Sequence, residues 1–229
     1  MTLPPPSPPP SSSPPAFPHA PDWARAGIAE LALLEPRFAS IEPAAGPLAW
    51  RVRQRGFAGL LRAMCGQQIS NQAAAAIWNR LRAIPGALEP AGLLAMDDAT
   101  LCGVAGLSRP KAAHARSLAT ACADGRLDFA AIAQMENEAA VAHIAAVKGL
   151  GPWTAEIHLL FAEQRPDVFP SGDLALAASA AQLFTLEARP TPKALAAMAL
   201  QWRPWRSLAA RLLWHHWRFV TGRPVVEDG

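Results

Sequence analysis

The stretch that decides the fold runs Ile144-Ala145-Ala146-Val147-Lys148-Gly149-Leu150-Gly151-Pro152-Trp153-Thr154-Ala155. Its apolar start is typical of a buried helix end, and Pro152 fits the first position of a following helix. Gly149 and Gly151 permit a tight turn with positive φ, and Leu150 between them can fill the gap between the two helices. The second helix then presents free N–H groups and the positive end of its dipole, which together bind a phosphate without reading base sequence. Taken alone, Gly-x-Gly is more typical of an ordinary glycine-capped corner between helices.

Helix signals fill the rest of the chain from Asp22 onward. Capping residues such as Asp22 and Asn137, and prolines that fit a first turn such as Pro204, mark the helix starts. They predict helices over 22–34, 57–65, 71–83, 111–123, 153–162, 173–184 and 204–217, with shorter ones near 101 and from 128, 137 and 192. No segment alternates with a period of two between turn signals, so we expect no sheet. The sequence predicts an all-α fold of about ten helices.

The composition is that of a folded and weakly basic chain. Of its 229 residues 51% are hydrophobic and 17% are charged, which suffices for one sizeable core or for two small lobes sharing a cleft. The net charge of +3, carried mostly by arginine, permits a polyanionic partner without requiring one. Cys65, Cys102 and Cys122 are scattered, so we expect reduced thiols and neither a disulfide frame nor a zinc site.

The N-terminal segment differs from the remainder. Residues 1–21 hold ten of the 23 prolines and are expected to form a disordered tail, whereas residues 22–229 are expected to form the folded domain. The sequence has no apolar run long enough to span a bilayer, and its N-terminus lacks a signal-peptide pattern. We therefore expect a cytoplasmic protein without a membrane partner, associated with the nucleoid if its partner is DNA.

In full, the string from Val147 to Ala155 resembles the hairpin of the helix-hairpin-helix (HhH-GPD) DNA glycosylase superfamily, which reads Gly-apolar-Gly-x-x-Thr-Ala. The matching residues are Gly149, Leu150, Gly151, Thr154 and Ala155. The resemblance covers about residues 57–217. It implies two helical lobes with the active-site cleft between them, and a monomer that binds double-stranded DNA containing a damaged base.

The same resemblance assigns binding roles to the hairpin. The hairpin backbone and Thr154 are expected to grip DNA phosphate, and Lys148 is expected to be a phosphate contact or a surface charge. Backbone carbonyls of Val147, Gly149 and Pro152 are the expected ligands of a structural Na⁺ or K⁺ ion.

A second signature follows the hairpin by about twenty residues. The loop Asp167-Val168-Phe169-Pro170-Ser171-Gly172-Asp173-Leu174 resembles the family's Gly- or Pro-rich loop, and Asp173 occupies the position of its catalytic carboxylate. Breaking an N-glycosidic bond develops an oxocarbenium-like sugar, which a fixed carboxylate stabilises while it positions a water. Asp173 also suits the cap of a following helix. Asp167 is expected to be a solvated loop residue.

The resemblance further implies a monofunctional enzyme. Glycosylases that also cut the DNA backbone use a lysine immediately before the hairpin threonine to form a Schiff base, and here Trp153 fills that place. Water is then the expected nucleophile. The iron–sulfur cluster of some relatives needs four C-terminal cysteines, and the sequence has none after Cys122, so we expect neither a cluster nor another required cofactor.

The tryptophans point to one branch of the family. Trp153 and Trp214 match pocket positions of the alkylation-repair branch, the DNA-3-methyladenine glycosylase II (AlkA-like) type, where indoles stack on a flipped cationic base. The string 203–207 also resembles that branch's C-terminal signature, with Arg206 expected to be structural or near a phosphate. The implied substrates are alkylated bases such as 3-methyladenine and 7-methylguanine.

A wedge residue is expected in the turn before the Ala-rich helix, because a flipped base leaves a gap in the duplex. Gln68 is the expected wedge and Ile69 the second choice, although relatives often carry Leu there. Glutamines that cap a helix end are an equal alternative. Two other functions remain open: a non-catalytic helix-hairpin-helix DNA-binding module, and a glycosylase for oxidised or mismatched bases.

Overall fold

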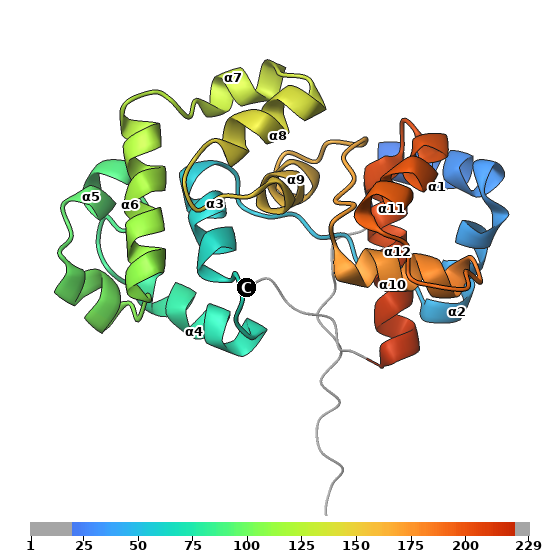
Figure 1. The fold of residues 1–229 in the computed structure, drawn as a ribbon, viewed down its shortest axis with the longest axis horizontal. Helices are drawn as coiled ribbons and strands as arrows, with labels where there is room; N and C mark the ends of the chain where they lie inside the picture. The colour runs from blue at the N-terminus through green and yellow to red at the C-terminus, as the bar shows by residue number, and fades with distance from the viewer. Residues whose placement is uncertain (1–19, 223–229) are drawn as a thin grey trace, which may run out of the picture.

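The computed structural model describes residues 20–222, which form helices without a strand in that range (Figure 1). The expected all-α fold is confirmed. Among the helices between residues 20 and 222, none combines the length and the hydropathy that a membrane-spanning helix requires. The expected tail, residues 1–21, lies outside the described range apart from Ala20 and Pro21. In chain order the elements are α1 (Asp22–Leu34), η1 (Pro36–Ser40), α2 (Ile41–Ala45), α3 (Gly56–Cys65), α4 (Asn71–Arg82), α5 (Pro90–Leu94), η2 (Ala99–Val104), α6 (Arg109–Ala123), α7 (Phe129–Gln134), α8 (Asn137–Ala145), α9 (Pro152–Phe161), α10 (Leu174–Leu183), α11 (Pro192–Ala199), η3 (Leu200–Trp202) and α12 (Arg206–Thr221).

The helices gather into two lobes, each with its own hydrophobic core (Figure 1). The first lobe contains α3 to α8 and one face of α9, and its core includes Leu60 and Leu118. The second lobe combines α1, η1 and α2 with α10 to α12, and its core includes Leu31, Trp202 and Leu212. Each lobe therefore has a separate core of buried apolar side chains. The chain passes from one lobe to the other twice.

Helix α9 belongs to both lobes. Ala155 and Leu159, four residues apart on one face, lie in the first core, while Ile157, Leu160 and Phe161 lie in the second. A helix that is apolar on both faces is buried between layers. Because the hairpin precedes α9 and the loop to Asp173 follows it, this helix fixes the spacing between them.

The other crossing is the extended segment 46–55, which packs closely on both α9 and α3. Its Arg53 N–H donates to the carbonyl of Phe161 at 2.9 Å. Gly59 of α3 lies against it so tightly that an added Cβ would be 1.8 Å from the carbonyl oxygen of Gln54. Glycine at position 59 is thus a requirement of backbone approach, and it places Arg53 and Gln54 beside the first lobe.

The helix caps are partly as predicted. Ser70 and Thr191 directly precede the helices predicted to begin at 71 and 192, and they accept hydrogen bonds from the N–H groups three residues later, at 3.3 Å and 3.2 Å. The predictions for three other starts were wrong. Asp22 and Asn137 are the first residues of α1 and α8 and do not cap them, and α12 begins at Arg206, two residues after Pro204. For Asn137 the reason is tertiary: its amide donates to the carbonyl of Asp167 instead.

Candidate active site

The hairpin between α8 and α9 has the backbone that its glycines predict. Gly149 has a φ of +98°, and a Cβ there would be 2.4 Å from the ring of His114 on α6. Leu150 is buried in the first core, as expected for a residue that fills the gap between the helices. Gly151 precedes α9 with an extended φ of −98°, and an added Cβ there would contact nothing within 4 Å. The backbone at Gly151 is therefore open to a ligand, while the backbone at Gly149 is packed.

The turn after α3 is tied to the hairpin by Gln67. Its amide donates to the hydroxyl of Thr154 at 3.0 Å and to the carbonyl of Gly149 at 3.3 Å. From the other side, Lys111 of α6 donates to the carbonyl of Cys65 at 2.7 Å. Gln68, the residue after Gln67, is exposed and has a φ of +59°, a left-handed conformation that is uncommon for residues other than glycine. The turn thus presents Gln68 outward from a well-supported base.

Asp173 lies at the end of the loop after α9 and caps α10. One carboxylate oxygen accepts from the backbone N–H groups of Ala175 and Leu176, at 2.9 Å and 3.0 Å. The indole N–H of Trp214 donates to the same oxygen at 3.2 Å, and the indole N–H of Trp153 donates to the other oxygen at 3.0 Å. Four donors from three helices therefore orient one half-buried carboxylate and stabilise its negative charge. The structure brings Asp173 and both predicted pocket tryptophans into direct contact.

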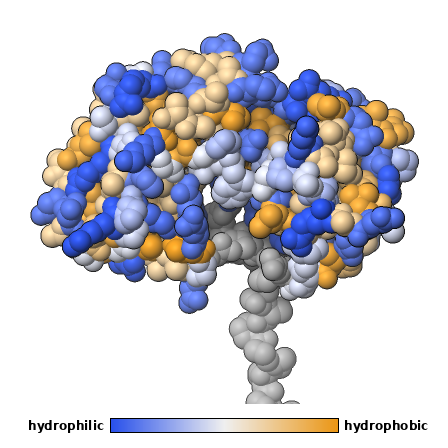
Figure 2. All heavy atoms as spheres, in the orientation of Figure 1, coloured by the Kyte–Doolittle hydropathy of each residue, from blue (hydrophilic) through white to orange (hydrophobic). Residues whose placement is uncertain are grey.

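A cavity of about 570 Å³ opens beside Trp153. Its walls come from the hairpin, from α3 with its following turn, from α4 and from the segment 46–55, and they include Gln54, Gln67 and Gln68. Figure 2 shows hydrophilic and hydrophobic side chains interspersed over the visible face of both lobes. The Trp153 side chain is 42% exposed and joins the cavity to the carboxylate. Trp214 is not among the described lining residues and stacks on Phe161, with ring centroids 5.5 Å apart.

A buried cation supports the ring that Trp214 stacks on. The guanidinium of Arg211 lies between Trp50 and Phe161, 4.1 Å and 4.5 Å from their ring centroids. It donates to the carbonyls of Arg51 and Leu160. Burial, together with neighbouring arginines, lowers the pKa of Arg211 to about 9. This side chain joins the segment 46–55, α9 and α12 behind the indole of Trp214.

Sequence reasoning missed several residues that organise this site. It did not predict that Arg53 and Gln54 line the cavity, and the signal available for this was the glycine at position 59 within an otherwise regular helix. The expectation that Asp167 is solvated was wrong. Its side chain is 19% exposed and forms a bidentate pair with Arg206, because the start of α12 lies directly against the loop.

Glu156 of α9 gives the molecule a testable pH dependence. Burial raises the pKa of this carboxyl from 4.5 to about 7. Between pH 4.5 and 7 the Glu156 carboxyl is protonated in the folded chain and ionised in the unfolded chain. The protonated carboxyl therefore favours the folded state fully below pH 4.5, and this contribution to the free energy of unfolding is lost as the pH rises towards 7. We expect Glu156→Gln to raise the free energy of unfolding near pH 8 by about 1–2 kcal/mol, allowing for partial solvent screening, with no gain near pH 4. Urea denaturation at both pH values measures this.

Glu163 provides the control of opposite sign. The pKa of its carboxyl is lowered, chiefly by the neighbouring imidazole of His158, whose Nε2 lies 3.6 Å from a carboxylate oxygen, and despite its burial, with Arg55 adding a favourable charge. Its stabilising contribution is therefore present above the ordinary value and lost as pH falls. Glu163→Gln is expected to destabilise the protein near pH 8. If both variants shift stability in the same direction, burial is not what sets the behaviour of Glu156.

Comparison with known proteins places these features in a family. Residues 61–205 match the family described as "HhH-GPD superfamily base excision DNA repair protein". The DNA-3-methyladenine glycosylase 1 of Schizosaccharomyces pombe is 30% identical over 158 residues, which cover 68% of this chain and 69% of that protein. A putative DNA-3-methyladenine glycosylase of Bacillus subtilis is 30% identical over 107 residues, covering 47% of this chain and 37% of the relative.

Solved structures agree with the sequence relatives. The 3-methyladenine DNA glycosylase of S. pombe in complex with abasic DNA aligns with a TM-score of 0.74 at 25% identity, over 89% of this chain and all of that chain. A DNA-3-methyladenine glycosidase from Bacillus halodurans aligns with a TM-score of 0.72 at 28% identity, over 82% and 87% of the two chains. The first of these chains is bound to DNA from which a base is missing.

Proposed function

Because this chain belongs to the HhH-GPD superfamily of base excision DNA repair proteins and is a DNA glycosylase, we propose that it removes alkylated bases such as 3-methyladenine and 7-methylguanine. The proposed enzyme is monofunctional and uses water as its nucleophile. The observation that carries the proposal is the Asp173 carboxylate, held by the indoles of Trp153 and Trp214 at the N-terminus of α10. Binding DNA phosphate does not by itself require a capping carboxylate that is also oriented by two indoles.

Asp173 is proposed to act on the deoxyribose of the flipped nucleotide. Its fixed negative charge stabilises the positive charge that develops on the sugar as the base departs, and the carboxylate can orient the attacking water. An alkylated purine already carries a positive charge, so it leaves without a strong general acid. Preorganisation is supported by the four donors around the carboxylate, since they do not need to reorganise during the reaction.

Trp153 and Trp214 are proposed to contact the flipped base. A cationic base over an indole gains about 2 kcal/mol when the pair is desolvated. Trp153 forms a wall of the cavity beside Asp173, which places an aromatic surface next to the proposed reaction centre. Both indoles therefore have two proposed roles. Each orients the carboxylate by its N–H group, and each offers a ring face to the base, which for Trp214 is the face opposite Phe161.

The hairpin and the turn after α3 are proposed to hold the DNA. Gly151 leaves its backbone open at the start of α9, and Lys148, three residues earlier in the hairpin, is exposed and is proposed to contact phosphate. Gln68 at the outward tip of the turn is proposed to fill the gap in the duplex, with Ile69, 36% exposed, next to it. Left-handed backbone in a residue other than glycine occurs at functional sites more than elsewhere, which supports this choice.

A monovalent cation at the hairpin stays part of the proposal. The carbonyl of Val147 accepts from the N–H of Leu150 at 3.0 Å, and that of Gly149 accepts from Gln67 at 3.3 Å. Each carbonyl oxygen has a second lone pair and can still bind Na⁺ or K⁺, together with Pro152. Such an ion would add positive charge where the DNA phosphate is expected to lie.

The substrate class is tested by incubating the protein with methylated DNA and identifying the released bases by chromatography. We expect 3-methyladenine and 7-methylguanine in the supernatant and no strand cleavage before alkali treatment. Duplexes carrying one oxidised base or one mismatch are run in parallel. Release only from these duplexes would identify a different glycosylase, and DNA binding without release of any base would identify a binding module. Strand cleavage without alkali would contradict a monofunctional enzyme.

A further inference from the structure

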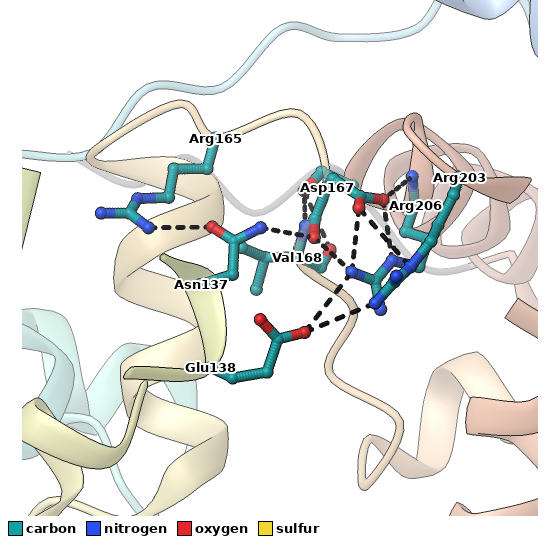
Figure 3. Close-up of polar contacts among 8 residues, drawn as sticks. Asn137, Glu138, Arg165, Asp167, Val168, Arg203 and Arg206 are labelled. Carbon is teal, nitrogen blue, oxygen red and sulfur yellow. Dashed lines mark hydrogen bonds and ion pairs between the residues drawn. The ribbon is translucent and has the colours of Figure 1, made fainter. Parts of the chain in front are cut away.

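A polar cluster forms where α8, the loop before Asp173 and the start of α12 meet (Figure 3). At its centre Arg206 binds the carboxylate of Asp167 through two parallel hydrogen bonds, from Nε at 2.7 Å and from Nη2 at 2.9 Å. Both side chains are largely buried, with exposed fractions of 14% and 19%. Bidentate arginine–carboxylate pairs fix orientation as well as distance, so this pair defines how the loop sits on α12.

The first turn of α12 also holds the backbone of the loop. Arg206 Nη2 donates to the carbonyl of Asp167 at 2.9 Å. The hydroxyl of Ser207 accepts from the N–H of Val168 and donates to its carbonyl, both at 2.8 Å, in a buried position. The N–H of Ser207 donates to the carbonyl of Pro166 at 2.9 Å. Three consecutive loop residues are thus attached to two residues of α12.

The same loop is attached to α8, the first helix of the hairpin. The amide of Asn137 donates to the carbonyl of Asp167 at 2.9 Å, and its oxygen accepts from Arg165 at 2.8 Å (Figure 3). The Asp167 carbonyl therefore receives one donor from each lobe, Asn137 from the first and Arg206 from the second. This one carbonyl oxygen of the loop therefore links α8, the first helix of the hairpin, to α12.

We propose that Arg206 is a positioning residue for the glycosylase reaction: it acts through Asp167 and fixes the carboxylate of Asp173 relative to the hairpin that anchors the DNA. The chain between Asp167 and Asp173 is held in place by packing and by a hydrogen bond. Phe169 between them is buried in the second core, and Asp173 N–H donates to the carbonyl of Pro170 at 2.9 Å. This inference rests on the proposed function, because it assumes that Asp173 acts on the sugar.

The test compares Arg206→Gln with Arg203→Gln as a matched control. Arg203 lies in the same cluster, but it is 53% exposed and its ion pairs with Glu138 and Asp167 are 3.5 Å and 3.8 Å long. Exposed pairs of this kind contribute little. In single-turnover release of 7-methylguanine, we expect Arg206→Gln to lower the rate by about 10- to 100-fold, with affinity for abasic DNA unchanged. Arg203→Gln is expected to match the wild type.

A double-variant comparison separates positioning from general stability. If Arg206 acts through Asp173, adding Arg206→Gln to Asp173→Asn should lower the residual rate no further. The same fractional loss in both backgrounds would overturn the proposal, as would an unchanged rate in Arg206→Gln alone. A loss of DNA affinity with an unchanged rate would also overturn it, since this would identify a phosphate contact. Asp167→Asn, which removes the paired charge at constant size, replaces Arg206→Gln if that variant does not fold.

A spectroscopic readout decides the proposal without relying on activity. The indole N–H groups of Trp153 and Trp214 bond to Asp173, so their NMR resonances report the position of its carboxylate. We expect Arg206→Gln to shift both resonances and Arg203→Gln to leave them in place. Unshifted resonances in Arg206→Gln would overturn the inference even in an active enzyme. A wild type that releases no methylated base would contradict the proposed function, while these resonances would still test the positioning role.

Discussion

Replacing Asp173 by asparagine is expected to lower the rate of methylated-base release by at least about 100-fold. The amide removes the negative charge that stabilises the developing sugar cation, and its NH₂ group would face the indole N–H donor of Trp153. The side-chain oxygen can still accept from the N–H groups of Ala175 and Leu176, so the cap of α10 is retained. Asparagine caps helices about as well as aspartate does, so the variant should fold.

Three measurements define this result. The rate of base release is followed under single-turnover conditions, affinity is measured on abasic DNA, and stability is measured by thermal unfolding. We expect only the first to change substantially. A rate within about three-fold of the wild type would remove Asp173 from the proposed mechanism, because fixed charges at a reaction centre contribute far more than this.

The second large effect is expected at Gly149. Alanine there would keep a φ of +98° that side chains disfavour, and its Cβ would be 2.4 Å from the ring of His114. The left-handed backbone costs about 1–2 kcal/mol and the overpacking about 1–3 kcal/mol, so Gly149→Ala should lower the free energy of unfolding by roughly 2 kcal/mol or more. Urea denaturation measures the loss. DNA affinity should fall as well, because the hairpin turn is distorted.

Gly151→Ala is the matched control within the same hairpin. Its φ is negative and an added Cβ would contact nothing within 4 Å, so stability should stay within about 1 kcal/mol of the wild type. If DNA phosphate approaches this backbone, the added methyl group should still weaken binding to a DNA duplex. Equal loss of stability in the two variants would mean that the packing against His114 does not distinguish the glycines.

The parts of the site that were predictable from sequence are local. The turn around Leu150 and the cap at Asp173 each depend on residues a few positions apart, so their patterns are visible in one stretch of chain. The all-α fold follows in the same way from caps and from the absence of a two-residue period. The boundaries of α3 and α4 were predicted to within one residue at each end.

The remaining parts depend on contacts between distant residues. Asp167 pairs with Arg206, 39 positions later, and Asn137 reaches the same loop from 30 positions earlier. The sequence alone does not reveal whether an aspartate is buried or solvated. For Asp167 the packing of α12 on the loop decides it. The lining of the cavity by Gln54 has the same origin, because the segment that carries it lies beside the hairpin only after the lobes have assembled.

The second lobe is assembled from two stretches that lie far apart in the chain, and this has a consequence for synthesis on the ribosome. Gly27 of α1 is so close to α12 that an added Cβ would be 2.6 Å from both Trp205 and Leu208. Helix α1 is translated early, but its packing partner α12 is translated last. Helices α3 to α9, in contrast, emerge from the ribosome as one continuous segment. Because domains generally fold as units in the order of their translation, the nascent chain should acquire the hairpin-bearing lobe before the lobe whose helix Asp173 caps.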